Sequence, residues 1–395
     1  MSIKLNAETL REFRVAKIFE ESCELKQSMC YSQDGRHLLV CDHHYLLVID
    51  CRSLQQLSLA NLQHYRPKLA CFTQRNDRLL HSSNKDDYLI RYLDLISHQY
   101  LGYFKGHKRA LRGLCFQPGS AHHFLSAGWD DRVLMWDLRC ERYTEKLKHL
   151  QRPLVAFDPS GLVCATCNNT QRIEIYDVRK MGSKPCQKFD YKQSEGAKWP
   201  KWTQLQFAPD GQSLLVSTDS GCCFSVDAFN GRLGQTYASY ANRDQLPLQA
   251  CYTPDSQHVL AGADRGRVHV WHAASGQLMA VLHSRCRQPV HRLQFHPHGS
   301  MFASSDESTR IWLPDRGEVQ QIVVEQESDD DQELPVIDLT NGDFDFSTIN
   351  INWPRPIPIP RSPSPVPVSR WRRRYIPRIP VADDEYESLE EGEIP

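Results

Sequence analysis

Residues 106–137 read GHKRALRGLCFQPGSAHHFLSAGWDDRVLMWD, and this stretch decides the fold. It opens on a Gly-His pair and closes on a Trp-Asp pair. Between them, an apolar strand of alternating pattern ends in Phe116, a second strand follows a turn, and a third strand follows a polar turn. Alternation of this kind predicts neighbouring strands of one β-sheet.

The same pattern recurs along the first 315 residues, and the end of the third strand marks each copy. These ends lie 44, 43, 40, 50, 45 and 41 residues apart. A four-stranded propeller blade takes roughly 40 to 45 residues, so the spacing predicts one blade per copy. Seven copies therefore predict an all-β fold, a seven-bladed WD-repeat β-propeller. The third strands end at Asp50, Asp94, Asp137, Asp177, Asp227, His272 and Leu313.

The turns between first and second strands have the composition that hairpins require. Proline fixes φ, and Gly or Asp tolerates tight backbone geometry. These turns read Gln33-Asp34-Gly35, Pro159-Ser160-Gly161, Pro209-Asp210-Gly211, Pro254-Asp255-Ser256 and Pro297-His298-Gly299.

A propeller leaves no open sheet edge at its seam only when its first and last blades share strands. Residues 13–19, FRVAKIF, precede the first copy in the register of an outer strand. We therefore expect this segment to complete the seventh blade, and we expect the propeller to span residues 1–317.

The third copy carries a full repeat signature in His107, Ser126, Asp130 and Trp136. These residues resemble the WD-repeat network in which His bridges a turn Asp and a strand Ser, while the Trp N–H adds a donor. Ser, His and Asp also suggest a hydrolase. Because all four lie within a blade, we expect a buried structural network and no catalytic residue. Other copies differ at these positions, so we expect the ring to depend more on strand packing.

Composition argues against several other classes. No stretch approaches the roughly 18 uncharged apolar residues of a membrane span, and no basic segment leads into an apolar run at the N-terminus. We therefore expect a soluble protein that is not secreted. The 14 cysteines lie mostly in apolar runs. Cys164 and Cys167 form a CxxC, but no second pair follows at zinc-finger spacing, so we expect no metal and no cofactor.

The charge is divided between two parts of the chain. Residues 318–395 contain 7 Lys and Arg against 17 Asp and Glu, which leaves 40 against 31 in residues 1–317. The body is therefore +9 and the tail −10. With 11 of the 23 prolines, the tail cannot bury enough apolar surface to offset its ordering entropy, and we expect it to be disordered. It either solubilises the molecule or folds back onto a basic face.

Six local motifs follow one another in the body: LREFRVAK at residues 10–17, SSNKDDYLIRYL at 82–93, YFKGH at 103–107, DAFNG at 227–231, YTPDSQ at 252–257 and WLP at 312–314. Their order resembles the Swd-type WD-repeat subunit of the COMPASS histone methyltransferase, the WD repeat-containing protein eighty-two family. The resemblance runs from about residue 5 to residue 314, and the SSNK stretch is its most specific part.

The resemblance implies a nuclear, non-enzymatic scaffold shared by two kinds of assembly. One methylates lysine four of histone H3, and there the propeller would tether the methyltransferase to the phosphorylated tail of RNA polymerase II. The other is a protein phosphatase 1 complex in transcription termination. The family's chain usually ends near residue 314, so this protein resembles a divergent paralogue with an extra C-terminal tail. An adaptor with different partners is the alternative.

The tail carries three short signals. An apolar run flanked by acids resembles a SUMO-interacting motif, or is a solvated linker. Residues 353–361 would form polyproline II and serve as a docking segment or a stiff spacer. Ser-Pro pairs predict phosphorylation, and a basic cluster predicts a nuclear-localisation or nucleic-acid patch unless it pairs with the acidic end. The residues are Val336, Ile337, Asp338 and Leu339 for SUMO, Ser362 and Ser364 for phosphorylation, and Arg370, Arg372, Arg373 and Arg374 for the basic cluster.

Two further classes of function have weaker support. An enzyme with its site in the central channel has no HExxH, phosphate-binding glycine loop or paired-carboxylate motif in its favour. Direct nucleic-acid binding by the +9 body would show a steep salt dependence. We therefore expect an adaptor that binds protein subunits, does not attach to membranes, and contacts nucleic acid indirectly if at all.

Overall fold

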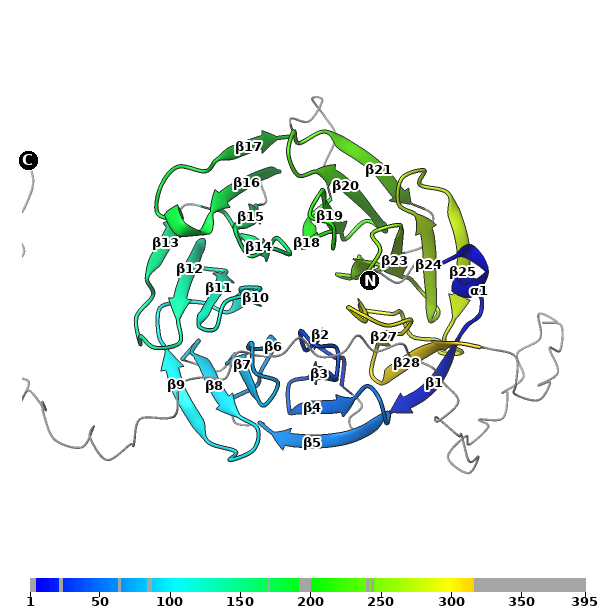
Figure 1. Cartoon of the computed structure of the whole chain (residues 1–395), viewed down its shortest axis with the longest axis horizontal. Coiled ribbons are helices and arrows are strands. Elements are labelled where there is room, and N and C mark those ends of the chain that lie inside the picture. The colour runs from blue at the N-terminus through cyan, green and yellow to red at the C-terminus, as the bar shows by residue number, and fades with distance from the viewer. Residues whose placement is uncertain are drawn as a thin grey trace, which may run out of the picture. The chain divides into compact units, whose positions relative to one another are not determined.

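The computed structural model describes residues 5–20, 24–62, 65–83, 87–148, 150–168, 171–191, 200–238, 242 and 245–315. In this part the chain forms seven antiparallel sheets of four strands each, which follow one another around a ring (Figure 1). The sheets are the blades of a propeller. The prediction of an all-β, seven-bladed β-propeller is therefore confirmed.

The first six blades each take four consecutive strands, and the seventh takes the last three strands together with β1. Blade one contains β2 (Ser28–Tyr31), β3 (His37–Cys41), β4 (Tyr45–Asp50) and β5 (Gln55–Asn61). Blade two contains β6 (Ala70–Phe72), β7 (Arg78–Ser82), β8 (Ile90–Asp94) and β9 (Tyr100–Phe104). Blade three contains β10 (Leu111–Phe116), β11 (His123–Gly128), β12 (Arg132–Asp137) and β13 (Glu145–Lys148). Blade four contains β14 (Leu154–Phe157), β15 (Val163–Cys167), β16 (Arg172–Asp177) and β17 (Gln187–Asp190), with the 3-10 turn η1 (Val178–Lys180) between the last two.

The remaining blades follow the same order. Blade five contains β18 (Trp202–Phe207), β19 (Ser213–Thr218), β20 (Cys222–Asp227) and β21 (Leu233–Ala238). Blade six contains β22 (Ala250–Tyr252), β23 (His258–Gly262), β24 (Arg267–His272) and β25 (Leu278–His283). Blade seven contains β26 (Arg292–Phe295), β27 (Phe302–Ser305), β28 (Thr309–Pro314) and β1 (Phe13–Phe19).

The ring closes where β1 pairs with β28 in antiparallel register. Phe13 lies opposite Pro314 and Phe19 opposite Thr309, with a bulge between Val15 and Lys17. The prediction that residues 13–19 complete the seventh blade is therefore confirmed. The seam is closed by strands from the two ends of the propeller, so neither end can fray without opening a sheet.

A single turn of helix, α1 (Ala7–Arg11), precedes this closing strand. Asn6 caps it by accepting a hydrogen bond from the backbone N–H of Thr9 at 2.7 Å. The side chain of Leu10 is fully buried and packs with residues of blades six and seven. The Arg11 side chain donates to the carbonyl oxygen of Met279 at 3.1 Å. The N-terminal segment therefore holds the outer edge of blade six as well as that of blade seven.

Each blade turns its first strand toward the axis of the ring and its fourth toward the periphery, as β2 and β5 show in Figure 1. The second and third strands are almost wholly buried, because apolar residues of adjacent blades pack against each other. The largest fully buried side chains are Trp136, Trp271 and Trp312. The core is thus a ring of interfaces between blades rather than one central cluster.

The turns between first and second strands lie where they were expected. Gly35, Gly161, Gly211 and Ser256 have φ values of 73°, 70°, 73° and 59°. Positive φ of this size favours glycine, which explains the glycine at three of these turns.

No helix in the described residues is long and apolar enough to cross a membrane. The predicted boundary between residues 317 and 318, and the prediction that the tail is disordered, concern residues that the structure does not describe. Both stay predictions.

Candidate functional site

The four signature residues of blade three meet in the interior of the blade. Nδ1 of His107 donates to Oδ1 of Asp130 at 2.9 Å, and its Nε2 lies 2.7 Å from Oγ of Ser126. The indole Nε1 of Trp136 donates to the same Ser126 oxygen at 2.8 Å. Asp130 also accepts from the backbone N–H of Lys108 at 3.0 Å.

Burial by itself would raise the pKa of Asp130, but the hydrogen bond from His107 and the N–H of Lys108 hold that pKa below its ordinary value. Ser126 and Trp136 are completely buried, and His107 is nearly so. A nucleophilic serine needs an open path to substrate, whereas this oxygen is buried and already accepts a hydrogen bond from the indole N–H. The geometry is therefore that of a strut that ties the turn before β12 to the inside of the sheet.

Blade seven contains a second, incomplete copy of this strut that the sequence analysis missed. Nε1 of Trp312 donates to Oγ of Ser304 at 2.8 Å, as Trp136 does to Ser126. Oδ1 of the turn aspartate Asp306 accepts a hydrogen bond from Nη1 of Arg310 at 2.7 Å, whereas the turn aspartate of blade three pairs with a histidine. The sequence contains a signal for this pair, because Ser304 lies two residues after the strand partner of Trp312, as Ser126 lies two residues after that of Trp136.

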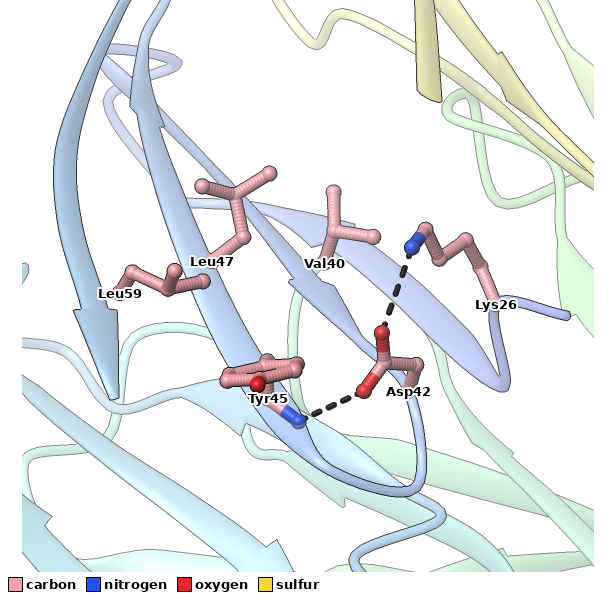
Figure 2. A pocket seen from close by; sticks show the side chains of 6 residues that line it. All are labelled: Lys26, Val40, Asp42, Tyr45, Leu47 and Leu59. Carbon is pink, nitrogen blue, oxygen red and sulfur yellow. Dashed lines mark hydrogen bonds and ion pairs between the residues drawn. The ribbon is translucent and has the colours of Figure 1, made fainter. Parts of the chain in front are cut away.

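In blade one the buried turn aspartate is paired with a lysine. Nζ of Lys26 lies 3.2 Å from Oδ2 of Asp42, and both side chains are almost fully buried (Figure 2). The other oxygen of Asp42 accepts the backbone N–H of Tyr45 at 2.6 Å. Val40, Leu47 and Leu59 line the same depression, which leaves no space for a water molecule. This site therefore holds a loop in place and offers no room for a ligand.

These lysine and arginine partners bear on the expectation that the ring depends more on strand packing than on polar networks. Blades one and seven lack the His signature, yet their turn aspartates are anchored by Lys26 and Arg310. The ring therefore depends on buried polar anchors in more blades than blade three. The two partners are hard to recognise from the sequence, because Lys26 lies 16 residues from its aspartate and Arg310 only four from its own.

A set of cations lies where the inner strands begin. Arg112 of β10 donates from Nη1 to the carbonyl oxygen of Arg152 and from Nη2 to that of Trp202 at 3.2 Å. Its guanidinium carbon lies 4.8 Å from the ring centre of Trp129, and that of Arg152 lies 5.3 Å from the same ring. One arginine thus bridges the inner edges of blades three, four and five.

Arg292 of β26 makes the equivalent bridge on the other side of the ring. Its Nε donates to the carbonyl oxygen of Gln27 at 2.7 Å, and its Nη1 donates to that of Pro247 at 3.2 Å. It therefore joins blades six, seven and one. Burial lowers the pKa of Arg292 to about 10. Burial also lowers the pKa of Lys68, just before β6, with further effects from the positive charges of Arg292 and Arg112.

We call Lys68, Arg112, Arg152 and Arg292 the inner rim. The sequence indicates only the +9 charge of the body, and this set of residues was not predicted from it. All pairs of these residues are 40 or more positions apart, and only closure of the ring brings them into one region. A basic residue within two positions of the start of a first strand, in six of the seven copies, is the signal that could have found it.

An open groove of about 360 Å³ lies beside the seam, between the end of β1 and the turn into β5. Its walls are residues 17–20 and 54–56. Lys17 and Glu20 are its only charged residues, so it contains no cluster suited to catalysis.

Cys164 and Cys167 both lie in β15, as expected, and both are buried and free. Burial raises the pKa of both thiols, that of Cys167 to about 12, which disfavours the thiolate that metals and electrophiles require. Among the described residues no group of three or more His, Cys, Asp or Glu is placed to hold a metal ion.

The remaining candidate residues lie outside the described residues. They are the SUMO-interacting candidates Val336, Ile337, Asp338 and Leu339, the phosphorylation candidates Ser362 and Ser364, and the basic candidates Arg370, Arg372, Arg373 and Arg374.

Comparison with known proteins gives consistent matches. Residues 98–137 and 276–313 match the WD domain, G-beta repeat family, and these are the two repeats that contain the Trp-to-Ser hydrogen bonds. The chain is 37% identical over 316 residues to WD repeat-containing protein 82 of Drosophila melanogaster, covering 80% of this chain and 98% of the relative. It is 28% identical over 339 residues to COMPASS component SWD2 of Saccharomyces cerevisiae, covering 80% and 99%. It is 28% identical over 246 residues to Set1 complex component swd2 of Schizosaccharomyces pombe, covering 60% and 68%.

Proposed function

The chain belongs to the WD repeat-containing protein 82 family, and on that premise we propose that it is a non-enzymatic scaffold subunit of a nuclear histone H3 lysine methyltransferase complex of the Set1/COMPASS kind. The resemblance to this family drawn from local motifs is thereby confirmed. One observation carries the proposal. The alignment takes in 98% of the fly relative and 99% of the yeast COMPASS component, so nearly the full length of both relatives has a counterpart here.

The structure supports a scaffold because its polar networks are used to hold the ring. The serine, histidine and aspartate of blade three are buried and already paired, as are the Lys26 and Asp42 of blade one. A rigid ring with many exposed loops suits the binding of several proteins at once. In this proposal the chemistry belongs to the partners.

The proposal extends to the two links that the family resemblance implies. In the methyltransferase complex the protein would contact the phosphorylated tail of RNA polymerase II, and in a second assembly it would join protein phosphatase 1. The +9 charge of the body suits a phosphorylated, negatively charged partner.

A diverged adaptor with different partners is the second candidate. The fly alignment covers 80% of this chain but 98% of the relative, so the remainder of this chain has no counterpart there. In this candidate the tail recruits SUMO-modified proteins through residues 336–339, with Ser362 and Ser364 as sites of regulation.

Affinity purification tests both candidates. The tagged full-length chain and a chain that ends at residue 317 would be recovered from nuclear extract, and their partners would be identified by mass spectrometry. The scaffold proposal expects methyltransferase subunits with both forms. Recovery of neither methyltransferase nor phosphatase subunits with either form would refute it.

The second candidate has its own control. Replacing Val336 and Ile337 by alanine in the full-length chain should abolish capture of SUMO, whereas replacing Phe344 and Phe346 should not. If the long and short forms recover the same proteins and neither binds SUMO, the diverged-adaptor candidate is wrong.

A further inference from the structure

The inner rim carries positive charges that are not neutralised by ion pairs within the described residues. Asp131 accepts the backbone N–H of Arg152 at 2.8 Å but makes no ion pair with its guanidinium. Arg112, Arg152, Arg292 and Lys68 form no ion pair with any carboxylate of the described residues. The two half-buried arginines are hydrogen-bonded to backbone carbonyl oxygens instead. A carbonyl satisfies an N–H donor but carries no net charge, so the cations remain electrostatically uncompensated.

The arrangement of these charges is circular. Arg112 spans blades three to five, Arg292 spans blades six, seven and one, and Lys68 stands at the start of blade two. The inner strands surround the axis of the ring (Figure 1), and each residue of the inner rim lies within two positions of the start of an inner strand. Burial, and then the positive charges of Arg292 and Arg112, lower the pKa of Lys68.

A purely structural role explains the two arginines but not the lysine. Each guanidinium ties three blades together through carbonyl oxygens, and this would stabilise the ring without any ligand. The ammonium of Lys68 forms no ion pair with the described residues, the side chain is half-buried, and the positive charges of Arg292 and Arg112 act on it. Like charges held together in this way are stabilised by a bound anion.

We propose that the inner rim binds a compact anion that carries several phosphate groups, of the inositol polyphosphate class. Charges set around an axis match a small ligand with charge on all sides, whereas an extended polyanion is best matched by charges along a line. Arg112 and Arg292 are fixed in advance by their carbonyl contacts, so little side-chain ordering opposes binding. Lys68 closes the ring of donors, and Arg152 on Trp129 supplies an exposed guanidinium at its edge.

This proposal does not depend on which protein complex the chain joins. It can be tested by calorimetric titration of the full-length chain with inositol hexakisphosphate at moderate salt. The expected result is one site per chain and a raised Tm. Lys68→Gln should weaken binding about tenfold, because one charge-assisted contact is lost, and Lys68→Arg should restore much of it.

The matched control is Lys184→Gln. Lys184 is exposed on the loop between η1 and β17 and forms no ion pair among the described residues. Its loss changes the net charge by the same amount and should leave the affinity unchanged. Equal weakening by Lys68→Gln and Lys184→Gln would show a non-specific charge effect and overturn the proposal.

Three competitors distinguish the classes of ligand. Inorganic phosphate, a phosphoserine peptide and a single-stranded RNA of equal total charge should each bind more weakly than inositol hexakisphosphate. Tighter binding of the peptide or the RNA, at a site that Lys68→Gln disrupts, would assign the rim to an extended partner and overturn the proposal. Absence of any binding of inositol hexakisphosphate to the intact chain would do the same.

Discussion

Nε2 of His296 donates to the carbonyl oxygen of Gly35 at 2.7 Å, across the junction of blades seven and one. Nδ1 of the same ring accepts the backbone N–H of His298 at 3.0 Å, so the imidazole is fixed from both sides. The contact joins the turn between β2 and β3 of blade one to the turn between β26 and β27 of blade seven. Blade seven is also the blade that β1 and β28 complete. The two turns therefore hold the first and the last blade of the chain together.

Gly35→Ala should destabilise the ring by about 2 kcal/mol or more. Gly35 has φ 73°, which costs a non-glycine residue about 1 to 2 kcal/mol, and an added Cβ would collide with the imidazole of His296. Urea unfolding of the full-length chain measures the loss.

Gly119→Ala provides the matched control, because Gly119 has nearly the same φ, 71°, and no atom lies within 4 Å of its added Cβ. It should cost only the conformational part of the loss, about 1 to 2 kcal/mol, and therefore less than Gly35→Ala. If the two variants unfold at the same urea concentration, the contact between His296 and Gly35 contributes nothing.

Phe13→Ala should destabilise the protein by about 3 to 5 kcal/mol, since a fully buried aromatic side chain is lost from the closing strand. Its ring centre lies 5.2 Å from that of Phe302 and 6.0 Å from that of Phe295. Ile18 of the same strand is 43% exposed, so Ile18→Ala should change stability by no more than about 0.5 kcal/mol. Equal effects in thermal melts would contradict the packing of β1.

Deletion of residues 1–19 tests closure more directly. Without β1 the edge of β28 is unpaired, so the whole ring should melt at a lower temperature than the full chain. A truncated chain with an unchanged Tm would show that blade seven does not need its fourth strand.

The blades and their closure could be predicted because they rest on local signals repeated along the chain. Period-two alternation, a turn residue at Gly35 or Gly211 and a fixed spacing each have one structural meaning. The anchor of Asp42 by Lys26 and the bridge from Arg112 to Trp202 have no such signal, because they depend on which loops meet in three dimensions. The turn aspartates Asp42 and Asp306 pair with Lys26 and Arg310 instead of a histidine, which also hides the role that they share with Asp130.

Ser126→Ala should cost about 3 kcal/mol, and Ser304→Ala about 1.5 kcal/mol, because a buried donor or acceptor left unsatisfied costs about 1 to 3 kcal/mol. Removing the Ser126 hydroxyl leaves both Trp136 Nε1 and His107 Nε2 without their hydrogen-bond partner. Removing the Ser304 hydroxyl leaves only Trp312 Nε1 without its partner. Denaturant unfolding of the two variants makes the comparison. Equal losses would show that His107 does not contribute through Ser126.

The stability of the ring should fall as the pH is lowered from about 6.5 to 4. Burial lowers the pKa of His81, His269 and His296 to about 4, although the contact with the Gly35 carbonyl acts in the opposite direction on His296. Between pH 4 and 6.5 the unfolded chain therefore binds more protons than the folded chain, so stability is complete above 6.5 and is lost toward 4. For His296 the loss is on the order of 3 kcal/mol.

His296→Gln separates this histidine from the carboxylates. A glutamine amide can still donate to the Gly35 carbonyl but does not titrate, so the stability of this variant should fall less between pH 6.5 and 4. Carboxyl groups do not obscure the difference in this window. Asp137, for example, is held by Arg139 at a pKa of about 2, so its contribution is present above its ordinary value of 3.8 and is lost only as the pH falls below it. Urea unfolding at pH 7, 5.5 and 4.5 gives the two profiles, and parallel profiles would mean that His296 titrates normally in the folded protein.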